Sequence, residues 1–333
     1  MTAGRIEPVD HGGDLDTARR RYPGAQLPWI DLSTGINPRP YPFTMPPMEA
    51  WTQLPQRSAE LALRQAAADR YGAPGVEMVV SAPGSQALIQ VLPRLIDPAD
   101  VTVLAPTYAE HAIAWARCGH RVSERSAIDD VGAARVVVVV NPNNPTGAIV
   151  STDALCELAS ALETRRGLLV VDEAFADFAP EASLVSRLPE RCIVLRSLGK
   201  AYGLGGVRAG FAIAQPTLAE ELRAEIGPWA VSGPALAIGR AALADVDWLS
   251  AAKARLTEDC QRLDAMLKAI GITLIGGTHL FRLVRHDDAA IIADRLGRNG
   301  IIVRRFAAQP TWLRFGLPGS EDAWKRLSSA LKD

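Results

Sequence analysis

The stretch "RVVVVVNPNNPTG", residues 135–147, places five consecutive valines before a run of asparagine, proline and glycine. Valine is β-branched and favours strands, and a strand without polar residues is typically buried on both faces of a parallel sheet. The proline and glycine residues that follow are strong strand breakers. The stretch therefore predicts an internal strand with a polar loop at its carboxyl end.

Other stretches repeat this form on either side of the first. Amphipathic segments lie between them, such as residues 153–165, which Ser151 and Thr152 precede as candidate N-caps. Alternating buried strands and helices predict a doubly wound α/β fold with a mostly parallel sheet. The four further strand candidates are "EMVVSAPGS" (77–85), "VTVLAPTY" (101–108), "LLVVDEAF" (168–175) and "CIVLRSLGK" (192–200).

Changes in composition divide the chain into three parts. The first 45 or so residues are rich in proline, which predicts an extended N-terminal arm over residues 1–45. The α/β pattern predicts a large domain over residues 46–225, and the glycine- and proline-containing stretch after it marks a boundary. Residues 226–333 then predict a smaller α+β domain, with a helical stretch at 241–270, four short strands, and a last helix from Ser320.

Charge and cysteine content limit the possible partners. The 333 residues include 36 basic and 37 acidic side chains, and this balance argues against a nucleic-acid or membrane partner. Four widely spaced cysteines without a CxxC pair argue against a zinc site or a disulfide framework. The N-terminus lacks the pattern of a signal peptide, and no apolar run is long enough to span a membrane. We expect a cytoplasmic protein.

Polar residues gather at the predicted carboxyl ends of the strands, where open α/β sheets bind ligands. The backbone at Gly84–Gln86 could bind an anion, although an ordinary strand-to-helix turn has the same sequence character. Asp172 could pair with a protonated ring nitrogen, cap a helix or bind a metal. Because only the adjacent Glu173 accompanies it at ligand spacing, we expect no metal site.

The stretch "RSLGKAYGLGGVRAG", residues 196–210, surrounds Lys200 with glycine and apolar residues. Most lysines lie at the surface, but a partly buried lysine near a second cation such as Arg208 has a lowered pKa, which suits Schiff-base formation. Ser197 and Arg208 could donate hydrogen bonds to a phosphate. The chain lacks GxGxxG and GxxxxGK[ST] at these loops, which disfavours a dinucleotide or nucleoside-triphosphate site.

The motifs "NPNNPTG" (141–147), "DEAF" (172–175) and "SLGKAYGLGGVRAG" (197–210) together resemble those of the class I/II aminotransferase superfamily, which are fold-type I enzymes dependent on pyridoxal phosphate. The resemblance implies that Lys200 holds the cofactor covalently and moves a proton. It departs at Phe175, where many members carry a tyrosine. The other cofactor contacts that it implies are Asp172 on the ring nitrogen, Asn144 on the 3-oxygen, Tyr108 on the ring face, and Gly84, Ser85, Gln86, Ser197 and Arg208 around the phosphate.

Within that superfamily the chain resembles the L-threonine-O-3-phosphate decarboxylases of cobalamin biosynthesis, close relatives of histidinol-phosphate aminotransferases. The segments that carry this resemblance are "HGGD" (11–14), "DLSTGINP" (31–38), "APTYAEH" (105–111), "DEAFADF" (172–178) and "PWAVSGPALA" (228–237). It implies a homodimer, a small phosphorylated amino acid as substrate, and release of CO₂ to leave (R)-1-amino-2-propanol phosphate. The implied substrate-binding residues are His11, Gly12, Asn144, Arg304 and Arg314.

Three readings stay open at this point. A histidinol-phosphate aminotransferase or related transaminase would use the same cofactor residues and break the Cα–H bond instead. A non-catalytic binding module could retain the fold without turnover. Gly35 stands where the decarboxylases carry an asparagine, which leaves the choice between threonine phosphate and serine phosphate open.

Overall fold

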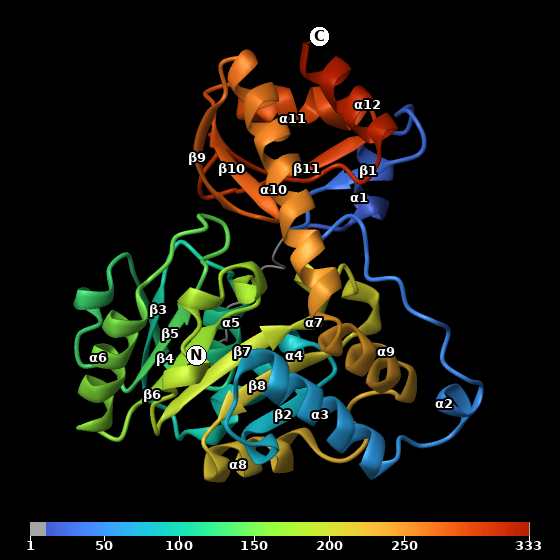
Figure 1. Ribbon diagram of the computed structural model, residues 1–333. Helices are drawn as coiled ribbons and strands as arrows, with labels where there is room; N and C mark the ends of the chain where they lie inside the picture. Colours follow the sequence, from blue (N-terminus) through green and yellow to red (C-terminus); the bar gives the residue numbers. More distant parts are fainter. Residues whose placement is uncertain (1–10, 333) are drawn as a thin grey trace. The chain divides into compact units, whose positions relative to one another are not determined.

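The computed structural model describes residues 11–332. Residues 1–10, which contributed to the expectation that the chain has no signal peptide, lie outside the described residues. The chain divides into two compact units (Figure 1). We call them the small unit, formed by Met1–Gly35, Cys260–Ile275 and Phe281–Asp333, and the large unit, formed by Ile36–Asp259 and Gly276–Leu280. The chain thus passes from one unit to the other at 35/36, 259/260, 275/276 and 280/281, whereas composition suggested boundaries at 45/46 and 225/226.

The large unit contains a mostly parallel seven-stranded sheet in the order β2-β8-β7-β6-β5-β3-β4. The five strands expected from sequence are present, and the doubly wound α/β prediction is confirmed. β8 runs antiparallel to both of its neighbours, and every other neighbouring pair is parallel. The strands are β2 (Val79–Ala82), β3 (Asp100–Leu104), β4 (Arg121–Arg125), β5 (Val136–Val140), β6 (Leu168–Asp172), β7 (Cys192–Ser197) and β8 (Gly210–Ala214).

Helices cover both faces of this sheet. Side chains of α4, α5 and α8 form one buried cluster with alternate strand residues such as Val136 and Val138. α3 and α6 contact β2 and β6 without joining that cluster, so they cover the opposite face, where Val137 and Val139 are also buried. The helices are α2 (Glu49–Thr52), α3 (Arg57–Tyr71), α4 (Ser85–Val91), α5 (Glu110–Arg117), α6 (Thr152–Glu163), α7 (Leu198–Ala201), α8 (Pro216–Ile226), α9 (Gly233–Ala244) and α10 (Val246–Ala269), of which the part from Cys260 onward belongs to the small unit.

Two helix boundaries refine the expectations. Ser151 caps α6 by accepting a hydrogen bond from the backbone N–H of Ala154, at 3.2 Å. The single helical stretch expected at 241–270 is interrupted at Asp245, which separates α9 from α10. The carboxylate of Asp245 accepts the backbone N–H of Trp248 at 2.9 Å, and an aspartate in this role starts a new helix.

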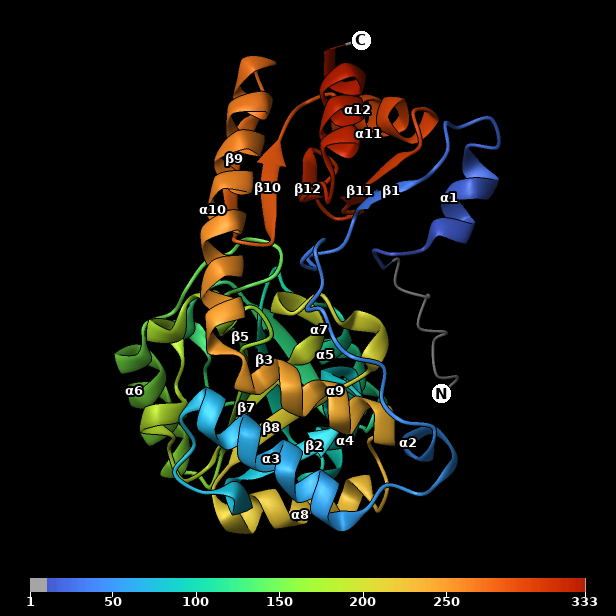
Figure 2. The same ribbon diagram turned by 45° about the vertical axis from the view of Figure 1, so that its right-hand side comes forward.

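The small unit contains a five-stranded sheet in the order β1-β11-β12-β10-β9 (Figure 2). Part of the expected extended arm is ordered structure here, because β1 pairs in parallel with β11 through Ile30 and Ile301. β12 is antiparallel to both β11 and β10. The elements are α1 (Leu15–Arg21), β1 (Ile30–Leu32), β9 (Thr273–Thr278), β10 (Phe281–Arg285), α11 (Ala289–Arg298), β11 (Ile301–Arg305), β12 (Trp312–Gly316) and α12 (Glu321–Lys332).

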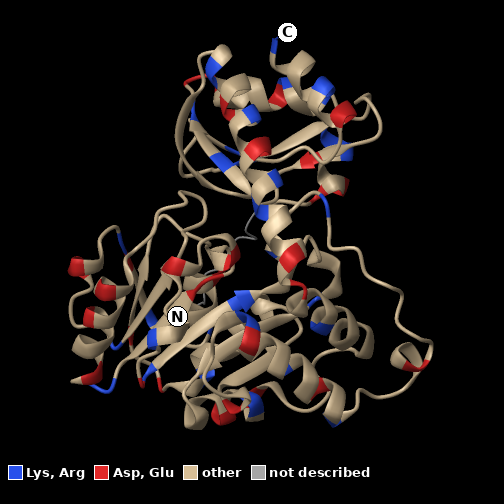
Figure 3. Ribbon diagram, in the orientation of Figure 1, with Lys and Arg blue, Asp and Glu red and all other residues tan. Residues whose placement is uncertain are grey.

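Charged side chains of both signs are interspersed on each unit, as Figure 3 shows. None of the helices in the described part of the chain is long and apolar enough to cross a bilayer.

Candidate functional site

The carboxyl ends of β2, β3, β5, β6 and β7 lie at one edge of the large sheet, because these strands share a direction. Val140 pairs with Asp172, and Asp172 pairs with Leu195, so β5, β6 and β7 end side by side. β8 begins at the same edge, where Gly210 pairs with both Ala82 and Ser197. The expected site segments at the ends of these strands are therefore brought together.

A cluster of hydrogen-bond donors lies where β2, β7 and β8 meet. Gly84 has φ +85° and ψ 155°, a conformation that is essentially restricted to glycine. A Cβ on Gly84 would lie 2.6 Å from Nη2 of Arg208, and a Cβ on Gly210 would collide with the backbone nitrogen of Ser85. The backbone N–H of Ser85, the guanidinium of Arg208 and the neighbouring Ser197 hydroxyl suit a phosphate dianion.

Lys200 lies on the short helix α7, directly beyond the end of β7. Its Nζ is 5.3 Å from the centre of the Phe175 ring, within cation–π distance. Asn37, which lies in the segment "DLSTGINP" (31–38) without an assigned role, forms hydrogen bonds with the backbone at Lys200 and Ala201. Its backbone N–H donates to the Lys200 carbonyl at 2.9 Å, and its side-chain Nδ2 donates to the Ala201 carbonyl at 2.8 Å.

Asp172 is a buried carboxylate with 4% of its surface exposed. One oxygen, Oδ1, accepts the backbone N–H of Ala174 at 3.0 Å. The other, Oδ2, lies 2.9 Å from Nε2 of His111, the last residue of the segment "APTYAEH", which had been assigned no role. An ionised carboxylate has about four acceptor positions, so this one retains capacity to accept the N–H of a protonated heterocycle.

The adjacent carboxylate, Glu173, serves a different purpose. Its Oε2 pairs with Nη1 of Arg196 at 2.8 Å, while Oε1 accepts the backbone N–H of Leu184 at 2.7 Å. Burial raises the pKa of Glu173, although Arg196 opposes that effect. Arg196 also pairs with Asp177 at 3.2 Å, so the ion pairs join the end of β6 to β7 beneath the site.

The aromatic and amide residues of the site are fixed by hydrogen bonds to one another. The hydroxyl of Tyr108 donates to Oε1 of Gln86 at 3.0 Å, and Nε2 of Gln86 donates to Glu110 at 3.0 Å. The structure thus shows the Gln86 side chain positioning Tyr108, while its contact with a phosphate stays a prediction. In the next loop, the Thr107 hydroxyl donates to Asn143 at 2.6 Å, directly beside Asn144.

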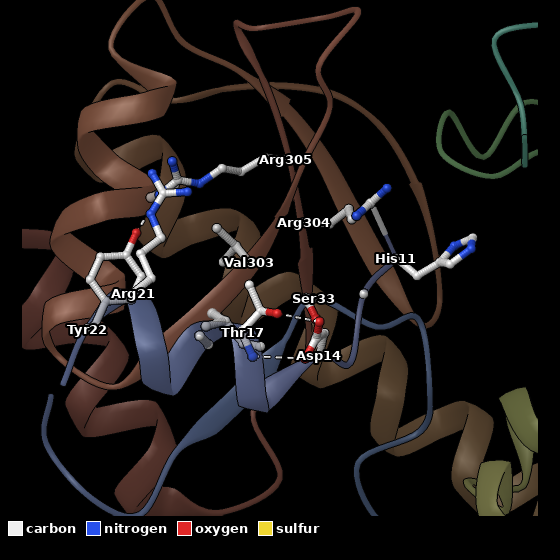
Figure 4. A pocket seen from close by; sticks show the side chains of 13 residues that line it. His11, Asp14, Thr17, Arg21, Tyr22, Ser33, Val303, Arg304 and Arg305 are labelled. Atoms are coloured by element: carbon white, nitrogen blue, oxygen red, sulfur yellow. Dashed lines mark hydrogen bonds between the residues drawn. The ribbon is translucent and has the colours of Figure 1, made fainter. Parts of the chain in front are cut away.

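The predicted substrate residues lie in the small unit. His11, Gly12 and Arg304 line a pocket of about 110 Å³ together with residues of α1 and β11. Figure 4 shows the His11 and Arg304 side chains on one side of this pocket, with Arg21 and Arg305 gathered on the other. Gly12 lies so close to the backbone of Ser33 that a Cβ would collide with it.

Arg314 is buried in β12, next to Arg304 across the β11–β12 ladder. Its Nη2 donates to the carbonyl of Ser33 at 2.8 Å. Burial and, to a lesser extent, the nearby positive charge of Arg304 lower the pKa of Arg314 to about 10, while Asp31 opposes the shift. Arg314 therefore stays charged at neutral pH, in surroundings where a bound anion would compensate that charge.

The predicted residues thus fall into two groups, one in each unit. The large unit combines a lysine beside an aromatic ring, a buried acceptor carboxylate and a donor cluster suited to a phosphate. These features fit pyridoxal phosphate, which carries an aldehyde, a basic ring nitrogen and a phosphate. The large-unit group is Gly84, Ser85, Gln86, Tyr108, Asn144, Asp172, Ser197, Lys200 and Arg208, and the small-unit group is His11, Gly12, Arg304 and Arg314.

Comparison with known proteins agrees with this assignment. Residues 47–331 match the family model described as aminotransferase class I and II. The chain is 43% identical to a threonine-phosphate decarboxylase from Pseudomonas aeruginosa, and the alignment covers 97% of each chain. It is 41% identical to a threonine-phosphate decarboxylase from Sinorhizobium sp., with 97% of this chain and 98% of that one covered. It also superimposes on the histidinol-phosphate aminotransferase from Sinorhizobium meliloti in complex with pyridoxal-5'-phosphate, with a TM-score of 0.80. The two sequences are 23% identical, and the superposition covers 99% of this chain and 97% of that one.

Proposed function

Because the chain belongs to the aminotransferase class I and II family, we propose that it binds pyridoxal phosphate and decarboxylates L-threonine O-3-phosphate. The products are (R)-1-amino-2-propanol O-phosphate and CO₂, and the reaction serves cobalamin biosynthesis. Two relatives named threonine-phosphate decarboxylase support this reading, since each aligns over nearly the full length of both chains. The observation that carries it is the pair of neighbouring arginines, Arg304 and Arg314, which suits a substrate with two anionic groups.

The large unit supplies the groups that hold the cofactor. When bound, pyridoxal phosphate withdraws electrons from the α-carbon of an attached amino acid. With pyridoxal phosphate bound, the Lys200 amine would hold the cofactor and would supply a proton to the substrate carbon after CO₂ leaves. Asp172 would accept a hydrogen bond from the ring nitrogen and would thereby favour its protonated form. Arg208, Ser197 and the backbone of Ser85 hold the phosphate.

The small unit supplies the groups that select the substrate. Arg314 binds the α-carboxylate, and its buried position leaves that carboxylate little competition from water. Arg304 and His11 bind the substrate phosphate, while Gly12 lets the backbone follow Ser33 closely. Two fixed anion sites determine how the substrate is turned about its α-carbon. By fixing this orientation, the chain's own residues would favour cleavage of the bond to the carboxylate over cleavage of the Cα–H bond.

The experiment is a CO₂-release assay with phosphothreonine, phosphoserine and histidinol phosphate. We expect CO₂ from phosphothreonine, and a Lys200→Ala variant should lose that activity. Amino transfer from histidinol phosphate to a keto acid, without CO₂ from phosphothreonine, would support the aminotransferase reading instead. Unchanged turnover in Lys200→Ala would support a protein that binds the cofactor without using the lysine.

We also propose that the chain is a cytoplasmic homodimer. An exposed apolar stretch of the large unit supports the dimer, and it comprises Phe43, Met45, Met48, Trp51 and Leu54. Exposed large apolar side chains that occur close together are common at interfaces between subunits. None of the four cysteines, all of which lie in the described part of the chain, forms a disulfide, which agrees with a reducing compartment. Light scattering after gel filtration should give twice the monomer mass, and Trp51→Glu should shift it toward the monomer.

A further inference from the structure

The stretch "INPRPYP", residues 36–42, alternates proline with other residues directly after the chain enters the large unit. We call it the proline segment. Proline has no backbone N–H and favours extended backbone, so from Asn37 onward only Asn37, Arg39 and Tyr41 can donate a backbone hydrogen bond. The proposed function gives this segment no role.

The backbone that carries Lys200 needs hydrogen-bond donors from elsewhere in the chain. Its helix, α7, has four residues, and the last four carbonyl groups of any helix have no partner within that helix. The proline segment supplies donors to three successive carbonyl groups. The N–H of Asn37 donates to Lys200 at 2.9 Å, and that of Tyr41 donates to Tyr202 at 2.8 Å. Between them, Nδ2 of Asn37 donates to Ala201 at 2.8 Å.

The Asn37 side chain is itself held in one orientation. It is buried, with 2% of the residue exposed, and its Oδ1 accepts the backbone N–H of Arg39 at 3.0 Å, which directs Nδ2 at Ala201. The segment also lies against Gly203, which has φ +68° and where a Cβ would lie 2.7 Å from the Asn37 carbonyl oxygen. The lysine turn therefore has little room to shift relative to Asn37.

We propose that Asn37 is a positioning residue that fixes the Lys200 backbone so that its amine meets the aldehyde of pyridoxal phosphate. The amine nitrogen adds to the aldehyde carbon, a C=N bond forms, and the aldehyde oxygen leaves as water without oxidation or reduction. This bond requires Nζ at one place, which depends on where the lysine backbone is held. The inference rests on the proposed function for the identity of the cofactor.

The experiment compares the dissociation constants of two ligands in the full-length apoprotein. Pyridoxal phosphate forms the bond to Lys200, whereas pyridoxamine phosphate has the same ring and phosphate but an amine in place of the aldehyde, so it cannot. Among the described residues, the Asn37 side chain forms hydrogen bonds with Ala201 and Arg39 and with none of the predicted phosphate-binding residues. A loss confined to pyridoxal phosphate therefore reports the position of Lys200, and a general loss of structure weakens both ligands.

The test variant is Asn37→Asp, which keeps the size of the side chain and an acceptor for Arg39 but places an oxygen against the Ala201 carbonyl. Asn299 provides a matched control in the small unit, because its Nδ2 donates to the Arg295 carbonyl at 3.1 Å, near the end of α11. Asn299→Asp makes the same exchange at another helix end. It should lower the melting temperature and leave both dissociation constants unchanged.

We expect Asn37→Asp to weaken pyridoxal phosphate about tenfold, the effect of leaving one buried carbonyl without its donor, and to leave pyridoxamine phosphate within twofold of the wild type. Borohydride should also fix a smaller fraction of the bound cofactor to Lys200, as measured by peptide mass spectrometry. Equal weakening of both ligands, or wild-type binding of both, would overturn the inference. If this variant fails to fold, Asn37→Ala replaces it, since it removes the donor without adding a carboxylate. If the wild-type protein binds no pyridoxal phosphate, the proposed function itself fails.

Discussion

Replacing Gly84 by alanine should weaken cofactor binding through Arg208. A side chain at φ +85° and ψ 155° is strained by about 1–3 kcal/mol, which should appear as lost stability. The new Cβ would also lie 2.6 Å from Nη2 of Arg208, about 1 Å inside normal contact distance. Because this atom ends a flexible side chain, we expect the guanidinium to move aside at little further cost in stability.

The displaced guanidinium no longer reaches the cofactor phosphate. A hydrogen bond to a charged group contributes about 1.5–3 kcal/mol, so the dissociation constant of pyridoxal phosphate should rise about 10- to 100-fold. The assay is an absorbance titration of the apoprotein with the cofactor, alongside urea denaturation.

Gly72→Ala is the control for backbone strain alone. Gly72 ends α3 at φ +76°, and a Cβ there would meet nothing within 4 Å. This variant should lose about 1 kcal/mol of stability and bind the cofactor as the wild type does. The reasoning is refuted if Gly84→Ala binds the cofactor within twofold of the wild type, or if both variants lose affinity equally.

Two further predictions concern charges in the small unit. Burial raises the pKa of Asp294, but hydrogen bonds from Tyr22 and Arg305 outweigh that effect and lower the pKa to about 2. The ionised carboxylate therefore stabilises the folded protein fully above the unfolded pKa of about 4, and this stabilisation is lost as the pH falls to 2. Because the carboxylate is partly exposed, Asp294→Asn should lower the free energy of unfolding by about 1 kcal/mol at pH 7. The melting temperature of this variant should meet that of the wild type near pH 2. A constant difference in melting temperature across this pH range would contradict the role given to Asp294. Burial and Arg304 lower the pKa of Arg314 to about 10, so the charged form of Arg314 is disfavoured in the folded state. Arg314→Gln should therefore match or exceed the wild-type melting temperature at pH 7. The same variant should lose phosphothreonine binding in a calorimetric titration. A clear drop in melting temperature with substrate binding retained would contradict this prediction.

Strands that are buried on both faces could be predicted from sequence, since their apolar character does not depend on which neighbours they have. β5 and β6 are examples, and each residue in them is buried. β4 has the sequence "RVSER" and is largely exposed at the sheet edge, so it lacked that signal. β1 has three residues in a proline-rich segment, and it is a strand because β11 pairs with it from the far end of the chain.

The candidate site could be predicted where its residues follow strand ends within recognisable motifs. Asp172 and Lys200 are of this kind, because a parallel sheet brings successive carboxyl ends to one edge. His111 and Asn37 also lie in quoted segments, but their contacts could not be predicted in this way. Their roles depend on contacts with residues 61 and 164 positions away, and neither side chain differs in type from an ordinary buried polar residue.

The most direct test of the proposed reaction is the fate of carboxyl-labelled L-threonine O-3-phosphate with the purified protein and pyridoxal phosphate, in the absence of any keto acid. We predict labelled CO₂ and 1-amino-2-propanol phosphate over many turnovers, with the cofactor recovered as pyridoxal phosphate. Stoichiometric conversion of the cofactor to pyridoxamine phosphate, with the label retained in the organic product, would contradict decarboxylation and establish amino transfer.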